Sequence, residues 1–144
     1  MKHFYTLCLC FVSAVCLAQP ANNDCINAVP INEVQDLEFT TVDATTDGPF
    51  HPDSPCPSNS DLDSIYSDVW YAYTATFTGN CFWTTCGTAD FDTKIAVYMP
   101  GSACPPMDED LLTCNEDGGN CSFFTSELLF RVDSGQTYLL HISG

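Results

Sequence analysis

The chain has 144 residues, of which 45% are hydrophobic, and this length and composition suit one globular domain. Nineteen acidic residues against three basic ones give it a formal charge of −16 at neutral pH. Such a charge repels phosphate backbones, which argues against nucleic acid and anionic membranes as partners, and it suits solubility or the binding of hard cations.

The N-terminus has the pattern of a secretory signal peptide. A short basic start precedes an apolar run from Phe4 to Leu17, and Cys16 and Ala18 put small residues at the −3 and −1 positions of a signal-peptidase site. The apolar run is shorter than the roughly 20 residues that a membrane span needs. We therefore expect residues 1–18 to be removed on export, without membrane insertion. The mature protein is then secreted or held at the cell surface.

Residues 19–144 have the pattern of a single all-β domain. Segments in which apolar and polar side chains alternate, or in which aromatic and β-branched residues predominate, are separated by turn residues. These predicted strands are residues 28–31, 37–44, 68–77, 81–86, 93–99, 111–114, 126–132 and 137–143. No segment shows the period of a helix, and repeated short strands predict an antiparallel β-sandwich.

The alternation also predicts which side chains form the core. The inward positions expected to be buried are Tyr73, Ile95, Val97, Phe130, Tyr138, Leu140 and Ile142. Aromatic side chains that could stack on sugars if exposed, but whose positions favour the core, are Trp70, Tyr71, Tyr73, Trp83 and Tyr98. His141 alternates outward on its strand and His51 lies in a Pro-rich loop, so both are expected at the surface.

Residues 45–67 form a long stretch without a predicted element. Four prolines and several Asp, Ser and Asn residues oppose regular structure there. A loop of this length in a small domain is either functional or tied down, and Cys56 near its centre indicates a cross-link.

Cysteines are numerous after the signal segment, and in an exported chain they indicate disulfides. The seven are Cys25, Cys56, Cys81, Cys86, Cys104, Cys114 and Cys121. We expect a Cys25–Cys56 pair to fasten the long loop and a Cys114–Cys121 pair to close the loop at 115–120. Cys81 and Cys86 can pair only if the chain turns between them, and Cys104 can pair with one of the others. The odd number leaves one thiol free or paired outside this chain, and the spacings lack the short paired knuckles of zinc sites.

Patterns of catalytic residues are missing from the sequence. There is no Gly-x-Ser-x-Gly nucleophile elbow, and a Cys–His pair would need a free thiol near His51 or His141. Acidic residues are so numerous that carboxylate pairs of the glycosidase type arise by chance. The sequence therefore favours a module that is not an enzyme.

Six motifs follow one another in a familiar order. They are NDC at 23–25, DVWYAYTA at 68–75, TCG at 85–87, FDTKIAVY at 91–98, CNED at 114–117 and GQTYLLHISG at 135–144. None is specific alone, but together they resemble the bacterial pre-peptidase C-terminal-like modules of secreted and cell-surface proteins. The resemblance covers nearly all of the chain after the signal segment.

This resemblance implies a β-sandwich of the jelly-roll type without a common catalytic residue. It also implies an accessory role, in which the module attaches to an extracellular polymer or supports a neighbouring domain of a longer chain. Members of the family usually continue past the last glycine with a turn and another strand, so the module ending at Gly144 is expected to lack its last strand. The alternative is the N-terminal part of a secreted hydrolase, a peptidase or glycosidase, whose catalytic domain follows Gly144.

Calcium is the cofactor that the sequence favours most. Asp90 and Asp92 stand at the entrance of a predicted strand, and Asn115 and Asp117 stand in a Gly-rich loop. Ca²⁺ needs six to eight oxygen ligands, and two such turns can supply several if they meet at one end of the sandwich. The alternative is that these residues only cap the local backbone, as Asp and Asn commonly do in turns.

Overall fold

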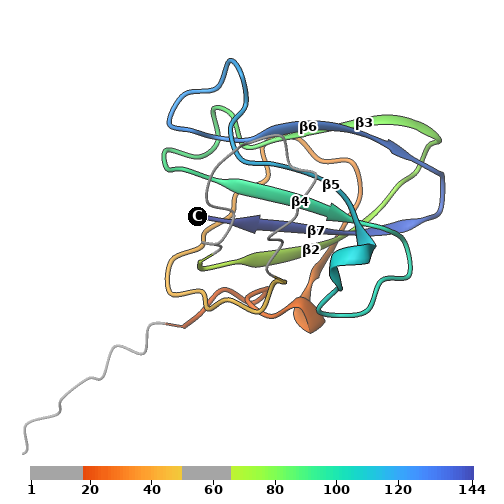
Figure 1. Ribbon diagram of the computed structural model, residues 1–144, viewed down its shortest axis with the longest axis horizontal. Coiled ribbons are helices and arrows are strands. Elements are labelled where there is room, and N and C mark those ends of the chain that lie inside the picture. Colours follow the sequence, from red (N-terminus) through yellow and green to blue (C-terminus); the bar gives the residue numbers. More distant parts are fainter. Residues whose placement is uncertain (1–17, 50–65) are drawn as a thin grey trace, which may run out of the picture.

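The computed structural model describes residues 18–49 and 66–144, and these form two layers of β-sheet without an α-helix (Figure 1). The larger sheet has the order β1 (Val29–Ile31), β2 (Val69–Thr74), β7 (Thr137–Ser143), β4 (Lys94–Tyr98) and β5 (Leu111–Asn115). The smaller sheet pairs β3 (Gly79–Thr84) with β6 (Glu127–Val132). Two single-turn 3-10 helices, η1 (Cys25–Asn27) and η2 (Asp108–Asp110), complete the elements. The predicted all-β sandwich is confirmed, but it is not wholly antiparallel, since β1 runs parallel to β2. The predicted signal segment lies almost wholly outside the described residues.

The core lies between the two sheets and is built by strict alternation along the strands. On the larger sheet Tyr71 stands opposite Leu140, and Leu140 stands opposite Val97. All seven side chains predicted to be buried belong to this core, Phe130 from the smaller sheet and the others from the larger one, and they are at most 5% exposed. On the smaller sheet Leu128, Phe130 and Val132 point inward while the residues between them face solvent. The period-2 pattern therefore identified the inner faces correctly.

The outer face of the larger sheet is also covered, which the sequence did not reveal. Residues 22–28 and 44–48 run beneath β2 and β7, and Trp70 and Tyr98 are fully buried against them. His141 shares this face and is only 1% exposed, so the prediction of a surface histidine was wrong. Its alternation was assigned correctly, but the face to which it points is packed rather than open. His51 lies outside the described residues.

A buried polar network fastens these covering segments to the sheet. His141 stacks on Trp70, with ring centroids 4.3 Å apart, and its Nε2 lies 3.0 Å from the Oδ2 of Asp68. That contact is within ion-pair distance, although the imidazole nitrogen is not aligned for a hydrogen bond. The Asp68 carboxylate also accepts the backbone N–H of Gly48 at 2.9 Å. A buried charge costs free energy unless it is paired or hydrogen-bonded. Residues 47–48 therefore stabilise the buried Asp68 carboxylate, and Asp68 in turn holds this covering segment against β2 and β7.

Asp47 joins the same network from the covering segment. One of its carboxylate oxygens accepts the indole N–H of Trp70 at 2.7 Å, and the other accepts the backbone N–H of Cys25 at 2.8 Å. The carboxylate therefore satisfies both a buried indole and the first residue of η1. Neither Asp47 nor Asp68 was singled out from the sequence, because their partners are distant along the chain.

The stretch at 37–44 is not a strand, contrary to the prediction. Its alternation is real, since Leu37 and Phe39 pack on the core while Glu38 and Thr40 are exposed. A strand also needs a neighbouring backbone to which it can hydrogen-bond, and this stretch pairs with none. Positive φ values at Asp36 and Asp43, 54° and 62°, turn the chain away at both ends.

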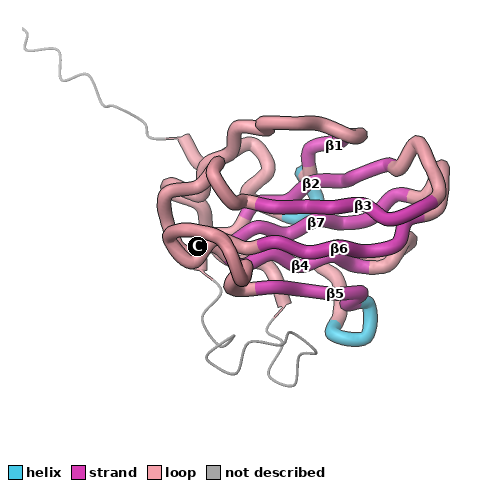
Figure 2. The backbone as a smooth tube through the Cα atoms, turned by 90° about the horizontal axis from the view of Figure 1, so that it is seen from above, coloured by secondary structure: helices cyan, strands magenta, loops and turns pink. Residues whose placement is uncertain are grey.

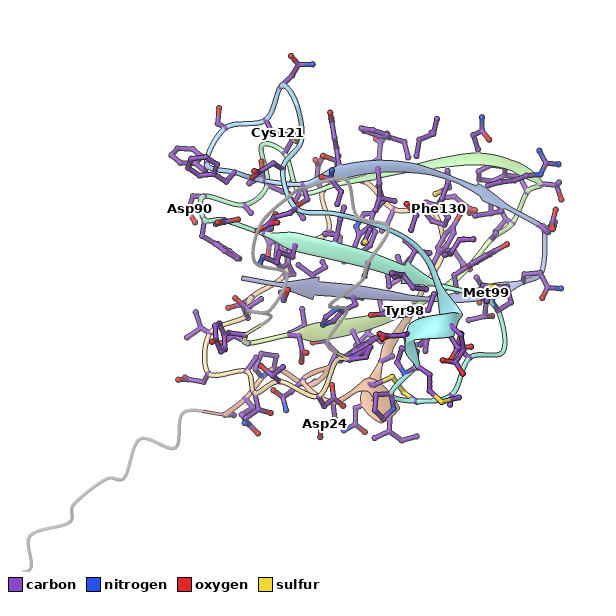
Figure 3. All side chains as sticks on the ribbon, in the orientation of Figure 1. Asp24, Asp90, Tyr98, Met99, Cys121 and Phe130 are labelled. Atoms are coloured by element: carbon purple, nitrogen blue, oxygen red, sulfur yellow. A yellow bond between two sulfur atoms is a disulfide. The ribbon has the colours of Figure 1, made fainter. Side chains whose placement is uncertain are left out.

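The described disulfides join Cys25 to Cys104 and Cys86 to Cys121. Both predicted pairings, Cys25–Cys56 and Cys114–Cys121, were therefore wrong, although the expectation that Cys104 has a partner is confirmed. Cys114 is also disulfide-bonded, and Cys56 lies outside the described residues. Each pair joins segments that the fold places side by side (Figure 3). Cys25 in η1 lies beside Cys104 in the β4–β5 connection. Cys86 and Cys121 lie in the β3–β4 and β5–β6 loops, which meet at one end of the sandwich. These disulfides indicate folding in an oxidising environment.

Packing around the Asp68–His141 pair leaves no room for a side chain at Gly48. A Cβ there would lie 2.7 Å from the His141 Nε2 and 2.8 Å from the Asp68 Oδ2. We predict that Gly48→Ala lowers the free energy of unfolding by about 1–3 kcal/mol, because the buried pair must move. The control is Gly119→Ala, since a Cβ at Gly119 meets nothing within 4 Å. Denaturant melts that show equal stability for the two variants would contradict the packing described for this network.

Candidate functional site

A groove of about 910 Å³ lies between residues 31–39 and β3. It exists because the two sheets have unequal widths. Seen from above, β3 and β6 lie over the middle strands of the larger sheet, and the edge strands β1 and β5 extend beyond them on either side (Figure 2). On the β5 side the chain closes against β6, since the backbone N–H of Glu127 donates to the Asn115 side chain at 2.9 Å. On the β1 side residues 31–39 approach β3 without pairing with it, and the groove remains between them.

The floor of the groove is the hydrophobic core itself. Tyr73, Leu140 and Ile142 rise to it from the larger sheet, and Phe130 and Trp83 from the smaller one. Trp83 is half-buried, so part of its indole is available to a ligand. Concave sites of this size with apolar and aromatic linings are typical of ligand-binding sites in proteins. Among the predicted aromatic candidates, Trp83 borders the groove, while Trp70 and Tyr98 are buried on the opposite face of the larger sheet.

Glu33 anchors the outer wall of the groove. Its carboxylate accepts the Tyr73 hydroxyl at 2.8 Å, and it accepts both the backbone N–H and the hydroxyl of Thr76, at 2.9 and 2.8 Å. These bonds, the backbone N–H of Thr76 foremost, lower the pKa of Glu33 to about 2. The ionised carboxylate thus holds residues 31–39, which form the outer wall of the groove, to the end of β2.

Cys81 is the free cysteine of the described residues, and it borders the groove. Burial raises the pKa of its thiol, the negative charge of Glu33 acts in the same direction, and a hydrogen bond with Tyr73 opposes both. A thiol with a raised pKa is a poor nucleophile at neutral pH. The odd cysteine count left one thiol either free or paired outside this chain, and among the described residues Cys81 is free. Nothing in the sequence indicated which of the seven it would be.

Comparisons with protein-family models, with curated proteins and with solved structures found no match. The resemblance to pre-peptidase C-terminal-like modules therefore rests on the sequence motifs alone. Within the described residues, no helix is long and apolar enough to cross a bilayer.

The predicted calcium ligands lie at a different site, the end of the sandwich where the β3–β4 and β5–β6 loops meet. The Cys86–Cys121 disulfide joins these two loops. The pKa of Asp92 is raised by burial, and further by the negative charges of Asp117 and Glu116. Lys94 offsets part of this charge, with its Nζ 3.0 Å from Glu116. Like-charged carboxylates are thus held at one place in the fold.

The four predicted ligands are not gathered into one cage. The amide oxygen of Asn115 already accepts the Glu127 N–H, which gives Asn115 a structural role at the start of β6. Asp90 is exposed and borders a shallow cleft beside the Cys86–Cys121 disulfide. Among the described residues, the one group of three His, Cys, Asp or Glu side chains with ligand atoms within 4.8 Å of one another consists of Cys86, Cys121 and Glu127. The disulfide occupies both of those sulfurs.

Sequence reasoning missed the residues that shape the groove. Glu33 and Cys81 are far apart along the chain and meet only because β2 carries Tyr73 between them. No local motif marks a carboxylate that bonds across the fold. The alternation at 37–44 was the one available signal, since it placed Leu37 and Phe39 on the core.

The anchoring by Glu33 predicts a pH dependence. The pKa is lowered from 4.5 to about 2, so this contribution to stability is fully present above pH 4.5 and is lost as the pH falls through about 2. Glu33→Gln removes the titrating group, so its melting temperature should fall less between pH 5 and pH 2 than that of the wild type. Glu38→Gln removes an exposed carboxylate from the same segment and should follow the wild type. If the melting temperatures of the wild type and both variants fall by the same amount between pH 5 and pH 2, Glu33 does not anchor the segment.

Proposed function

We propose that this protein is a non-catalytic, exported binding module that holds its ligand in the groove beside β3. The observation that carries the proposal is the groove itself, about 910 Å³ in volume, with a floor of core side chains and a half-buried tryptophan at its side. The groove is bounded by an anchored segment and a disulfide-containing end, so it is held open by the fold. The ligand is an extracellular polymer or a neighbouring domain of a longer chain.

Several observations support this proposal. The sequence begins with the pattern of a signal peptide, and the disulfides suit an extracellular protein. The motifs resemble pre-peptidase C-terminal-like modules, which accompany other domains. The free thiol in the groove has a raised pKa, which suits a binding wall better than a nucleophile. The alternative, that the chain is the N-terminal part of a secreted hydrolase, is compatible with the same groove acting as a substrate-holding surface.

Binding through the groove can be tested with Trp83→Ala. We predict that the wild type co-sediments with at least one insoluble extracellular polymer among cellulose, chitin and fibrous collagen, and that Trp83→Ala weakens this at least tenfold. The control is Leu129→Ala, which removes an apolar side chain that is 62% exposed on the outer face of β6. Melting curves establish that both variants are folded. Equal binding by the two variants would contradict binding through the groove. No binding by the wild type to any of the three would exclude these polymers as the ligand and leave a neighbouring domain.

We further propose that the acidic end binds calcium weakly through Asp92 and Asp117. Burial raises the pKa of Asp92 most, and the negative charges of Asp117 and Glu116 add to it; a cation there would relieve this added repulsion. We predict that free Ca²⁺ at ten times its dissociation constant stabilises the fold by about 1.4 kcal/mol, with a much smaller effect of Mg²⁺. The Asp92→Ala, Asp117→Ala double variant should lose this response at a constant high concentration of NaCl, which screens the charge of the whole chain. An equal shift in wild type and double variant would eliminate the site.

A further inference from the structure

We infer that the groove accepts an extended, basic polypeptide strand, which pairs with the free edge of β3 and becomes the third strand of the smaller sheet. This inference rests on the proposed function and specifies its ligand. It follows from three features of the described residues: the direction of the backbone groups of β3, the chemistry of the groove floor, and the charge around the groove.

The backbone of β3 offers hydrogen bonds to the groove. In an antiparallel pair, residues alternate between those that bond to the partner strand and those whose N–H and C=O point away from it. Thr85 donates its N–H to the Ser126 carbonyl at 2.9 Å, so the bonded positions continue through Trp83, Cys81 and Gly79. The N–H of Glu127, one residue further along β6, points away to Asn115, which confirms the alternation.

Asn80, Phe82 and Thr84 therefore direct their backbone N–H and C=O groups away from β6. The smaller sheet has no other strand, and no described residue bonds these outward groups. An unpaired edge of this kind is a template for another strand, and a sheet of only two strands is itself weakly stable. The six residues of β3 span about 20 Å, enough to hold a peptide of similar length.

The floor of the groove fits one face of such a strand. A strand added to β3 would place every second side chain on the same face as Cys81 and Trp83, over Tyr73 and Leu140. Apolar side chains at alternate positions would then cover the half-buried Cys81 and Trp83. This mode, in which main-chain bonds give affinity and alternate side chains give specificity, is a general form of peptide recognition.

The negative charge around the groove favours a basic strand over a second copy of this chain. Glu33 and Asp36 are the charged residues that line the groove, and the chain as a whole carries −16. A strand with lysine or arginine at its outward positions is attracted to this surface. A second copy of this chain, which would bring another −16, is repelled.

The first test uses an end-capped peptide of about eight residues in which valine alternates with lysine and threonine. Binding is followed by the fluorescence of Trp83 and by protection of the Cys81 thiol from a maleimide. We expect binding below about 1 mM, and binding at least tenfold weaker when glutamate replaces lysine. No protection at that concentration, or equal binding of the acidic peptide, overturns the inference.

Two N-methylated forms of the peptide test the backbone pairing. One carries the methyl groups on the valines and the other on the lysines and threonines. Pairing with β3 uses the N–H groups of only one set, so one form should bind as the parent does and the other at least tenfold more weakly. If both forms bind equally, the peptide does not pair with the edge.

The protein side offers a matched pair of variants at one position. Phe82→Pro removes an outward N–H without removing a bond to β6, and Phe82→Ala keeps that N–H while removing the same side chain. We expect the proline variant to lose at least tenfold in affinity and the alanine variant to stay within threefold of the wild type. If the proline variant does not fold, the N-methylated peptides decide.

Two other results are distinguishable from these. Binding of a polysaccharide to Trp83 without peptide binding would overturn strand pairing and leave the proposed function intact. A dimer in sedimentation that disappears in Phe82→Pro, but not in Phe82→Ala, would make a second copy the occupant and overturn the inference.

Discussion

The unequal width of the two sheets is the constraint on which the rest of this structure depends. A five-stranded sheet presents more apolar surface than a two-stranded sheet can cover. On one flank the difference is closed by the contact between β5 and β6, with Asn115 bonding the start of β6. On the other flank it is closed only by residues 31–39, which Glu33 holds in place without a strand pairing. The groove, its apolar floor and the free edge of β3 all follow from this difference.

The buried polar network and the disulfides lie outside the core between the two sheets. The outer face of the larger sheet buries a polar network in which Asp47 and Asp68 satisfy Trp70 and face His141. The Cys86–Cys121 disulfide joins the two loops that carry Asp92 and Asp117, and the negative charge of Asp117 adds to burial in raising the pKa of Asp92. The polar network and the disulfide each join segments that are remote in sequence, and neither fills the groove.

Alternation along the chain was sufficient to predict the sandwich and its inner faces, because side-chain direction in a strand is a local property. It predicted burial at Leu37 and Phe39 even where no strand forms. Pairing was not predictable there, since it depends on whether another backbone lies alongside. His141 shows the same limit, because the sequence gives the face of the sheet on which a residue lies but not whether another segment covers that face.

The sites show a similar division between local and distant information. The two acidic turns could be expected to lie at one end of the sandwich, because they stand at the same end of neighbouring strands, and the Cys86–Cys121 disulfide joins the two loops there. The cysteine pairs and the groove could not be predicted, because Cys25 and Cys104 are separated by 79 residues and the groove is assembled from distant segments. Spacing along a chain carries little information about such distances.

Hydrogen exchange of the β3 amides in the free protein tests the central claim most directly, namely that this strand has one unpaired edge beside the groove. The backbone amides of Asn80, Phe82 and Thr84 should exchange at least about tenfold faster than those of Cys81 and Trp83, which are bonded to β6. Such alternation along a single strand would establish the free edge. Uniform protection of all five amides would mean that another segment already pairs with β3, and the groove would then have no free strand edge to offer a ligand.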